Sequence, residues 1–195
     1  MRIVTGKAKG CNLTAPAGEE TRPTLAQVKE AVFSMIQFDL VGKEILDLFA
    51  GSGQLGLEAL SRGAAHATFV DISGKAIAAI EQNAAKTRLA DGCTIVRAGW
   101  SDFLRMRGGK VVYDFVFLDP PYDMGVLPAV LRCLLKYRML RKTSLVICES
   151  AQAADVFDGD EELRACFHTE RENRYGQAYI TLLSPVLSDR AEESV

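Results

Sequence analysis

The tetrapeptide Asp119-Pro120-Pro121-Tyr122 follows an apolar run, residues 113–118, that is typical of a buried strand. Ligands of open α/β sheets bind beyond the carboxyl ends of the strands, which is where this motif would lie. Proline fixes φ and has no N–H, so the Asp119 carboxylate and the Pro120 carbonyl remain as acceptors beside an aromatic ring. These groups can hold an exocyclic amine and stack on the planar base that carries it. The alternative is a strand-end turn with an exposed acid.

A glycine-rich loop lies between another expected strand and a helix. The loop is not a Walker A sequence, because no Gly-Lys-Ser/Thr follows it, but its glycines would let a ligand approach the backbone closely. Asp71, followed by Ile72, comes twenty residues after Gly51, at the offset of a ribose-binding acid. The acid that opens the loop would repel a phosphate and attract a cation, which favours S-adenosyl-L-methionine over a dinucleotide. The alternative is a tight turn and a solvent-facing acid. The candidate loop residues are Asp47, Phe49, Ala50, Gly51, Ser52 and Gly53.

Strands and helices are expected to alternate around these motifs, which predicts a mostly parallel sheet with right-handed crossovers. Near the end, residues 163–169 and 178–183 are strand-like and are joined by 171–176 without a helix, which predicts a hairpin and one antiparallel strand. The expected strands are 45–49, 67–70, 94–96, 112–118 and 144–149, and the expected helices begin at Thr24, Gln54, Ser73 and Val126.

The composition is that of a globular protein, with 48% hydrophobic and 25% charged residues. We expect a small basic hairpin or flap at 1–20, one catalytic domain at 21–186, and a frayed acidic tail at 187–195. No stretch predicts a membrane span or a signal peptide, which favours a cytoplasmic protein. A net charge of −2 argues against non-specific coating of nucleic acid but allows a local basic face.

Cysteine and histidine usage predicts no metal centre. The five cysteines are odd in number and have no C-x-x-C spacing, and the chain has only two histidines. Reduced thiols in packing roles are therefore expected.

Together these motifs resemble the bacterial small-subunit rRNA guanine-N2 methyltransferases of the RsmD type, over about residues 1–183. The loop at 47–53, the segment 55–63, Asp71 and the tetrapeptide at 119–122 carry the likeness, and 2–7 and 21–24 resemble the amino-terminal signature of that family. The resemblance implies a Rossmann-like class I methyltransferase fold, α/β, with a seven-stranded, mostly parallel sheet, one antiparallel strand and helices on both faces. It also implies S-adenosyl-L-methionine as donor and a guanine N2 of 16S rRNA as acceptor.

Transferred to this chain, the resemblance places the loop residues, Asp119 and Ile72 in the cofactor site, Asp71 at the ribose hydroxyls, and the tetrapeptide at the target base. One position departs from the family, because Gly99 stands where an Asp or Asn usually reaches the adenine amine. Either Asp102 substitutes for that acid, or backbone groups of Gly99 and Trp100 do; Trp100 alternatively only packs on the sheet edge.

The expected partner is 16S rRNA within a small-subunit assembly particle, bound by a monomer. The residues expected to contact RNA phosphates are Arg2, Lys7, Lys9 and Arg22. A second basic run at 132–142 is either a further RNA contact or a solvated helix face, and Arg174 and Tyr175 could border the pocket.

We expect Asp119 to orient the target amine, and no histidine in these motifs supports a His-based mechanism. Two other functions remain open. One is adenine-N6 methylation of DNA or RNA, against which the lack of room for a sequence-reading domain counts. The other is a catalytically silent RNA-binding assembly factor, which the intact Asp119 and glycines disfavour.

Overall fold

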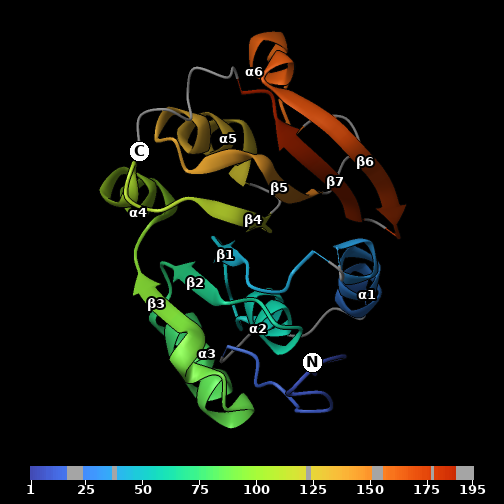
Figure 1. Ribbon diagram of the computed structural model, residues 1–195, viewed down its shortest axis with the longest axis vertical. Helices are drawn as coiled ribbons and strands as arrows, with labels where there is room; N and C mark the ends of the chain where they lie inside the picture. The colour runs from blue at the N-terminus through green and yellow to red at the C-terminus, as the bar shows by residue number, and fades with distance from the viewer. Residues whose placement is uncertain (17–23, 37–38, 122–123, 151–155, 177, 188–195) are drawn as a thin grey trace.

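Seven strands form a single sheet in the computed structural model, which describes residues 1–16, 24–36, 39–121, 124–150, 156–176 and 178–187, with side chains in the first helix from Lys29 onward (Figure 1). The strands are β1 (Glu44–Asp47), β2 (His66–Asp71), β3 (Cys93–Arg97), β4 (Tyr113–Leu118), β5 (Leu140–Ser150), β6 (Phe167–Tyr175) and β7 (Ala178–Pro185).

The order across the sheet is β3-β2-β1-β4-β5-β7-β6. Strands β1 to β5 pair in parallel, whereas β7 pairs antiparallel with both β5 and β6. The sheet thus has one reversed strand, next to last in space, and the predicted class I methyltransferase fold is confirmed.

Helices cover both faces of the sheet (Figure 1). One core cluster packs under the first three helices and the other under the last three, and alternate residues of the wholly buried β4 enter opposite clusters: Phe115 and Phe117 the first, Val116 and Leu118 the second. Apolar residues on both faces of a strand are typical of a central parallel strand. The helices are α1 (Thr24–Ile36), α2 (Gln54–Ser61), α3 (Gly74–Thr87), α4 (Trp100–Arg107), α5 (Leu127–Lys136) and α6 (Glu161–Ala165), with a 3-10 turn, η1, at Ala90–Gly92.

Two helices are absent from the sequence-based expectation. Helix α4 buries only Phe103 and Leu104, so its sequence has too few apolar positions at helical spacing to predict a helix. The strand expected at 163–169 is wrong in its first half, because Leu163 lies in α6, capped by the Asp160 side chain, which accepts from Leu163 N. The expected connection at 171–176 is also wrong, since β6 continues through it to Tyr175.

The amino-terminal segment packs on α2. Arg2 and Asn12 form an antiparallel bridge, as a small hairpin requires, and Ile3, Ala8 and Leu13 are buried in the same core cluster as α1 and α2. The hairpin therefore shares the core of the domain behind it.

A buried carboxylate fixes that hairpin. Glu58 of α2 has no exposed surface and accepts hydrogen bonds from Val4 N at 2.8 Å, Thr5 N at 3.0 Å and Arg62 Nε at 2.8 Å. Lys29 of α1 lies 3.4 Å from the same carboxylate, and burial lowers the pKa of its ammonium group. A buried charge with several partners is costly to disturb, so this network holds the hairpin against α2.

Candidate active site

Three acids lie at the carboxyl edge of the sheet. Asp47, the last residue of β1, is in register with Phe69 of β2 and Phe117 of β4. Asp71 and Asp119 come two residues after those partners, so the topology brings the ends of all three strands together. In this fold class that edge is the ligand site.

The glycine-rich loop is tied to the end of β2. Asp71 accepts from Gly51 N at 2.9 Å through one carboxylate oxygen and from Ser73 N at 2.8 Å through the other. Ala50 N also donates to Val70 O at 3.0 Å. Asp71 thus holds the loop and the start of α3 in one arrangement, in addition to any ligand that it binds.

Two glycines of this segment meet requirements that other residues would not. Gly51 has φ of 53°, in the left-handed region that side chains disfavour. A Cβ on Gly56, in the first turns of α2, would lie 2.3 Å from Cε1 of Phe69. The close packing of α2 on β2 therefore depends on glycine at position 56.

Asp47 lies beneath the loop and is almost completely buried. Its carboxylate accepts from Gly56 N at 3.0 Å. Burial raises the pKa of this carboxyl to about 7, and the nearby Asp71 charge adds to the rise, while the bond from Gly56 opposes it. A buried carboxyl of this kind gains a favourable partner when a cation arrives. The buried Asp47 carboxyl therefore fits the ammonium group of S-adenosyl-L-methionine.

Asn83 of α3 is a further residue of the loop, which the sequence analysis missed. Its side chain is fully buried; it accepts from Thr14 N at 2.8 Å and donates to Thr14 O and Ser52 O, each at 2.9 Å. It therefore links the amino-terminal hairpin to the glycine loop. The available signal was an amide at helical spacing between the apolar residues Ile80 and Ala84 on the buried face of α3.

Gly99, where the resemblance predicts an acid, has the acidic residue Asp102 as a neighbour. Gly99 precedes α4, and Asp102 Oδ1 pairs with Arg105 at 2.8 Å. Asp102 Oδ2 lies 3.9 Å from the position of a Cβ on Gly99, and Ile72 Cδ1 lies 4.0 Å from it. Trp100 is half-buried against the second core cluster, as in the packing alternative.

The remaining predicted pocket residues surround this edge. Asp119 is half-buried, Pro120 is buried, and Pro121 is exposed with its carbonyl accepting from Met124 N at 3.0 Å. Phe49 is half-buried against the second core cluster. Tyr122 and Arg22 lie outside the described residues.

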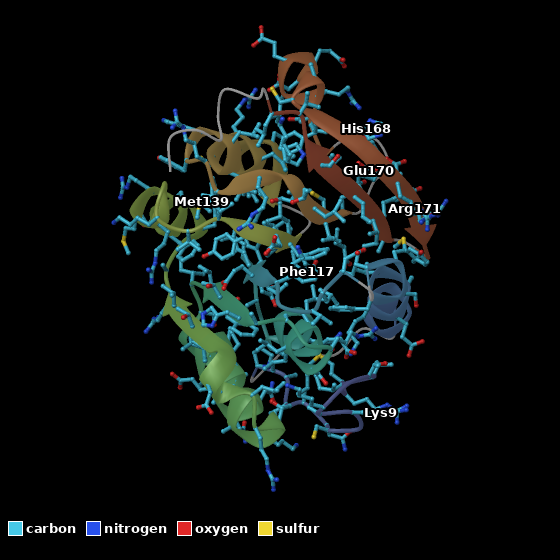
Figure 2. The ribbon with its side chains drawn as sticks, in the orientation of Figure 1. Lys9, Phe117, Met139, His168, Glu170 and Arg171 are labelled. Atoms are coloured by element: carbon cyan, nitrogen blue, oxygen red, sulfur yellow. The ribbon has the colours of Figure 1, made fainter. Side chains whose placement is uncertain are left out.

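The basic residues of the hairpin lie at different distances from the loop. Arg2, Lys7 and Lys9 are all exposed. Lys7 N donates to Ser61 O, in the last turn of α2, whereas the glycine loop precedes the first turn of that helix. A helix of eight residues is about 12 Å long, so Lys7 lies about that far from the loop. Lys9 lies on the same hairpin, far from β6 (Figure 2).

Part of the second basic run is paired with acids. Arg132 forms an ion pair with Asp160, and Arg141 lies 3.5 Å from Asp114. These pairs agree with the solvated-face alternative for the run.

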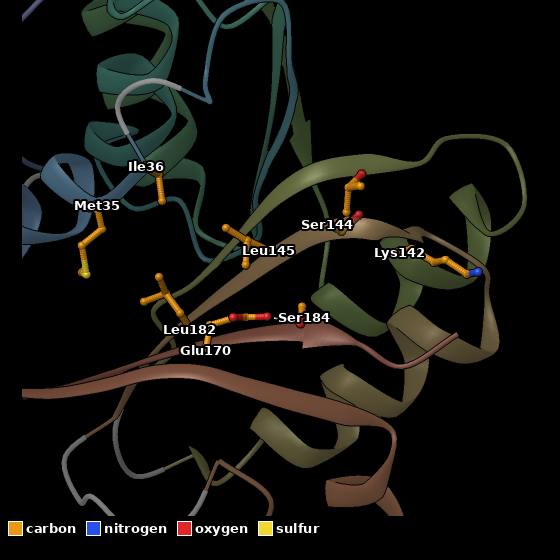
Figure 3. A pocket seen from close by; sticks show the side chains of 9 residues that line it. Met35, Ile36, Lys142, Ser144, Leu145, Glu170, Leu182 and Ser184 are labelled. Carbon is orange, nitrogen blue, oxygen red and sulfur yellow. Dashed lines mark hydrogen bonds between the residues drawn. The ribbon is translucent and has the colours of Figure 1, made fainter. Parts of the chain in front are cut away.

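A shallow pocket of about 350 Å³ lies elsewhere (Figure 3). It is at the amino-terminal part of β5, the opposite end of that strand from the three acids, and Glu170 and Ser184 hydrogen-bond across its wall at 2.6 Å. It is not part of the candidate active site. The lining residues are Met35, Ile36, Lys142, Thr143, Ser144, Leu145, Glu170, Leu182 and Ser184.

Over the residues whose placement is described, no group of three or more His, Cys, Asp or Glu side chains could hold a metal ion. Within the same parts of the chain, no helix has the length and apolar character that crossing a bilayer requires.

Comparison with known proteins identifies relatives of nearly the same length. The Escherichia coli K12 protein named "Ribosomal RNA small subunit methyltransferase D" is 33% identical over 177 residues, which cover 91% of this chain and 86% of the relative. The Bacillus subtilis protein YlbH is 40% identical over 157 residues, which cover 80% and 85%. The solved structure of yhhF from Escherichia coli superposes with a TM-score of 0.83 at 31% identity, covering 96% of this chain and 99% of that one.

Residues 1–184 match the family described as "Conserved hypothetical protein 95". The match includes the amino-terminal hairpin as well as the sheet, so it spans every element that builds the site. The chain belongs to this family, to which the small-subunit rRNA methyltransferases D also belong.

Proposed function

We propose that this protein transfers a methyl group from S-adenosyl-L-methionine to the N2 amine of a guanine in 16S rRNA. The observation that carries the proposal is the convergence of Asp47, Asp71 and Asp119 at one edge of the sheet, around a loop shaped by glycine. The name of the Escherichia coli relative, a small-subunit rRNA methyltransferase, supports the choice of acceptor.

On the donor side, Asp47 faces the ammonium group, the Gly51–Gly53 loop gives the methionine part access to the backbone, and Asp71 accepts from the ribose hydroxyls. Phe49, Ala50 and Ser52 complete the wall of this subsite. Ile72, which is 73% exposed, covers one face of the adenine. Asp102, with the backbone of Gly99 and Trp100, lies at the adenine edge.

On the acceptor side, the Asp119 carboxylate and the Pro120 carbonyl accept the two N–H protons of the target amine. This holds the nitrogen with its lone pair toward the donor, and positioning of that kind can contribute about 7–11 kcal/mol at the extreme. Pro121 stiffens the turn, and Tyr122 stacks on the extruded base, a contact of about 1–3 kcal/mol. When bound, the donor supplies a methyl group on a positively charged sulfur. As the C–N bond formed, the bond between the methyl carbon and sulfur would break, its electron pair would stay on sulfur, which would leave as a neutral thioether, and the proton lost from N2 would pass to the Asp119 carboxylate.

The substrate in this proposal is rRNA in a small-subunit assembly particle, bound by a monomer in the cytoplasm. Arg2 and Arg22 contact phosphates beside the pocket. Lys7 and Lys9, which lie farther along the hairpin, contact phosphates of a longer RNA strand. Such contacts add affinity without reading sequence.

The test is methyl transfer from labelled donor to unmethylated 30S subunits, naked 16S rRNA and duplex DNA, with digestion of the product to nucleosides. N2-methylguanosine from either RNA is the expected result. N6-methyladenosine, or label in DNA, would support the adenine-N6 alternative instead. Absence of label in all three substrates would favour the silent assembly factor.

Asp119→Ala tests the division of the pocket into a donor side and an acceptor side. We expect it to abolish transfer and to leave donor affinity within about twofold, since Asp119 acts mainly on the acceptor. Glu172→Ala, an exposed acid on β6, is the control and should retain activity. Loss of donor binding in Asp119→Ala would contradict the division between donor and acceptor sides.

A further inference from the structure

The reversed strand β7 places a basic and aromatic pair near the carboxyl edge of the sheet. In the antiparallel register, Tyr179 lies opposite Ser150, the last residue of β5, and Arg174 of β6 lies opposite Tyr179. The Arg174 guanidinium is 5.5 Å from the centre of the Tyr179 ring, and its Nε donates to Gly176 O at 2.8 Å. The side chain is therefore held over the ring.

This pair lies just beyond the carboxyl end of β4, the end from which Asp119 and Pro120 continue. Leu118 of β4 is in register with Cys148 of β5, and Pro120 and Ser150 each follow two residues later. Tyr179 is opposite Ser150, so its row is two residues beyond the row of Leu118 and Cys148, on the side where Asp119 and Pro120 continue from the end of β4, and β7 is the second strand from β4. Two strand spacings are about 10 Å.

Alternation along β7 decides which face of the sheet the pair occupies. Ile180 and Leu182 enter the core cluster under α1 to α3, whereas Leu183 enters the cluster on the other face. Tyr179 and its partner Arg174 therefore lie on the α4–α6 face. Arg174 is exposed and Tyr179 is half-buried, whereas Tyr175 packs against the first cluster.

We infer that the Arg174–Tyr179 pair binds a nucleotide that flanks the target guanine, with the ring or the guanidinium plane stacked on its base. The inference rests on the proposed function and adds a substrate contact to it. Bases splayed out of a loop are recognised by stacking on aromatic rings and arginine planes, and the guanidinium nitrogens can also reach a phosphate. About 10 Å corresponds to roughly three stacked nucleotides, and to fewer when bases are splayed apart.

Arginine on the opposite face of the same strand provides a matched control. Arg171 is also exposed, and it is in register with Leu182, whose side chain enters the first core cluster (Figure 2). Arg171→Ala thus removes the same charge from β6 without touching the face that carries Tyr179. General electrostatic attraction to RNA would make the two arginines equivalent, whereas a local contact would not.

The experiment measures KM and kcat for unmethylated 30S subunits, and the Kd of S-adenosyl-L-methionine, for Arg174→Ala, Tyr179→Leu, Tyr179→Phe and Arg171→Ala. We expect Arg174→Ala and Tyr179→Leu each to raise KM about tenfold, which corresponds to about 1.4 kcal/mol and lies within the range of base–aromatic stacks. Tyr179→Phe keeps the ring and should stay within about twofold of wild type. Donor Kd should not change in any variant.

Equal KM values for Arg174→Ala and Arg171→Ala would overturn the inference. Arg174→Ala removes only an exposed side chain, so it decides the question even if Tyr179→Leu does not fold. The proposed function fails separately, if the wild-type protein methylates no RNA. Filter binding of 16S rRNA then still tests the surface, because weaker retention by Arg174→Ala than by Arg171→Ala would support it and equal retention would reject it.

Discussion

Binding of the donor should depend on pH through Asp47. Burial raises the pKa of this carboxyl to about 7, so much of the free protein carries a neutral Asp47 below that pH. The donor's ammonium group favours the ionised carboxylate, and the apparent dissociation constant scales inversely with the ionised fraction. Affinity should therefore increase as the pH rises toward 7.

The magnitude follows from the ionised fraction, which is about 3% at pH 5.5 and about 50% at pH 7.0 for a pKa of about 7. The donor should bind about 15-fold more tightly at pH 7.0 than at pH 5.5. Both values lie below the range of about 7.7–8.0 in which an α-amino group titrates, so the donor keeps its charge throughout. Binding at pH 6.5 should release about 0.8 proton.

Isothermal titration calorimetry checks both numbers, since buffers with different ionisation enthalpies report the protons released. Asp47→Asn is the control: it can still accept from Gly56 N, but it cannot titrate. Its donor affinity should be weak and independent of pH. If wild type and Asp47→Asn changed equally between pH 5.5 and 7.0, Asp47 would not be the group that faces the donor.

Conformational stability should depend on the same carboxyl. Its folded-state pKa is raised above the ordinary value of 3.8, so its contribution to stability is complete below about pH 4 and is lost as the pH rises through about 7. At pH 8, Asp47→Asn should therefore increase the free energy of unfolding, by at most about 4 kcal/mol for a shift of this size. Urea denaturation at pH 4 and pH 8 measures the difference. A variant that was equally or less stable at pH 8 would show that ionised Asp47 is not strained in the free protein.

Substitutions at Gly56, Asn83, Asp102 and Gly99 test the loop and the adenine edge of the site. Gly56→Ala should lower stability by about 1–3 kcal/mol in thermal unfolding, because its Cβ would overlap the Phe69 ring, whereas Gly99→Ala, with no atom closer than 3.9 Å, should be neutral. Asn83→Ala should raise the donor KM several-fold at unchanged kcat, because Ser52 O loses a buried donor, and an unchanged KM would limit Asn83 to a structural role. Asp102→Ala should weaken donor binding several-fold, and adding Gly99→Asp should restore it; no rescue would mean that backbone groups contact the adenine.

The strands and the acids that end them could be predicted from local sequence. Residues 115–118 are apolar without interruption and are followed by an acid and two prolines, and the structure has β4 at Tyr113–Leu118. The capping serine is equally local: Ser73 accepts from Ala76 N at 3.4 Å and starts α3 at the expected residue. Such features depend only on residues that are close to one another in the sequence.

Short helices with a single buried turn could not be predicted in the same way. Helix α6 buries only Leu163, and its sequence of acids and arginine carries no periodicity. It forms because Asp160 caps it and because it packs on β6 and α5, which are tertiary facts.

The contacts that fix the amino-terminal hairpin could not be predicted from the sequence. From its lysines alone, the segment reads as a basic flap that is free to clamp RNA. The groups that fix it are Glu58 on α2 and Asn83 on α3, more than fifty and more than sixty residues away from their partners. Both look like ordinary polar helix residues until the fold buries them, and a buried carboxylate or amide requires partners. The hairpin satisfies that requirement and, through Asn83, also positions the carbonyl of Ser52. In the proposed function, the first residues of the chain therefore support the donor side of the site, in addition to any contact that they make with RNA.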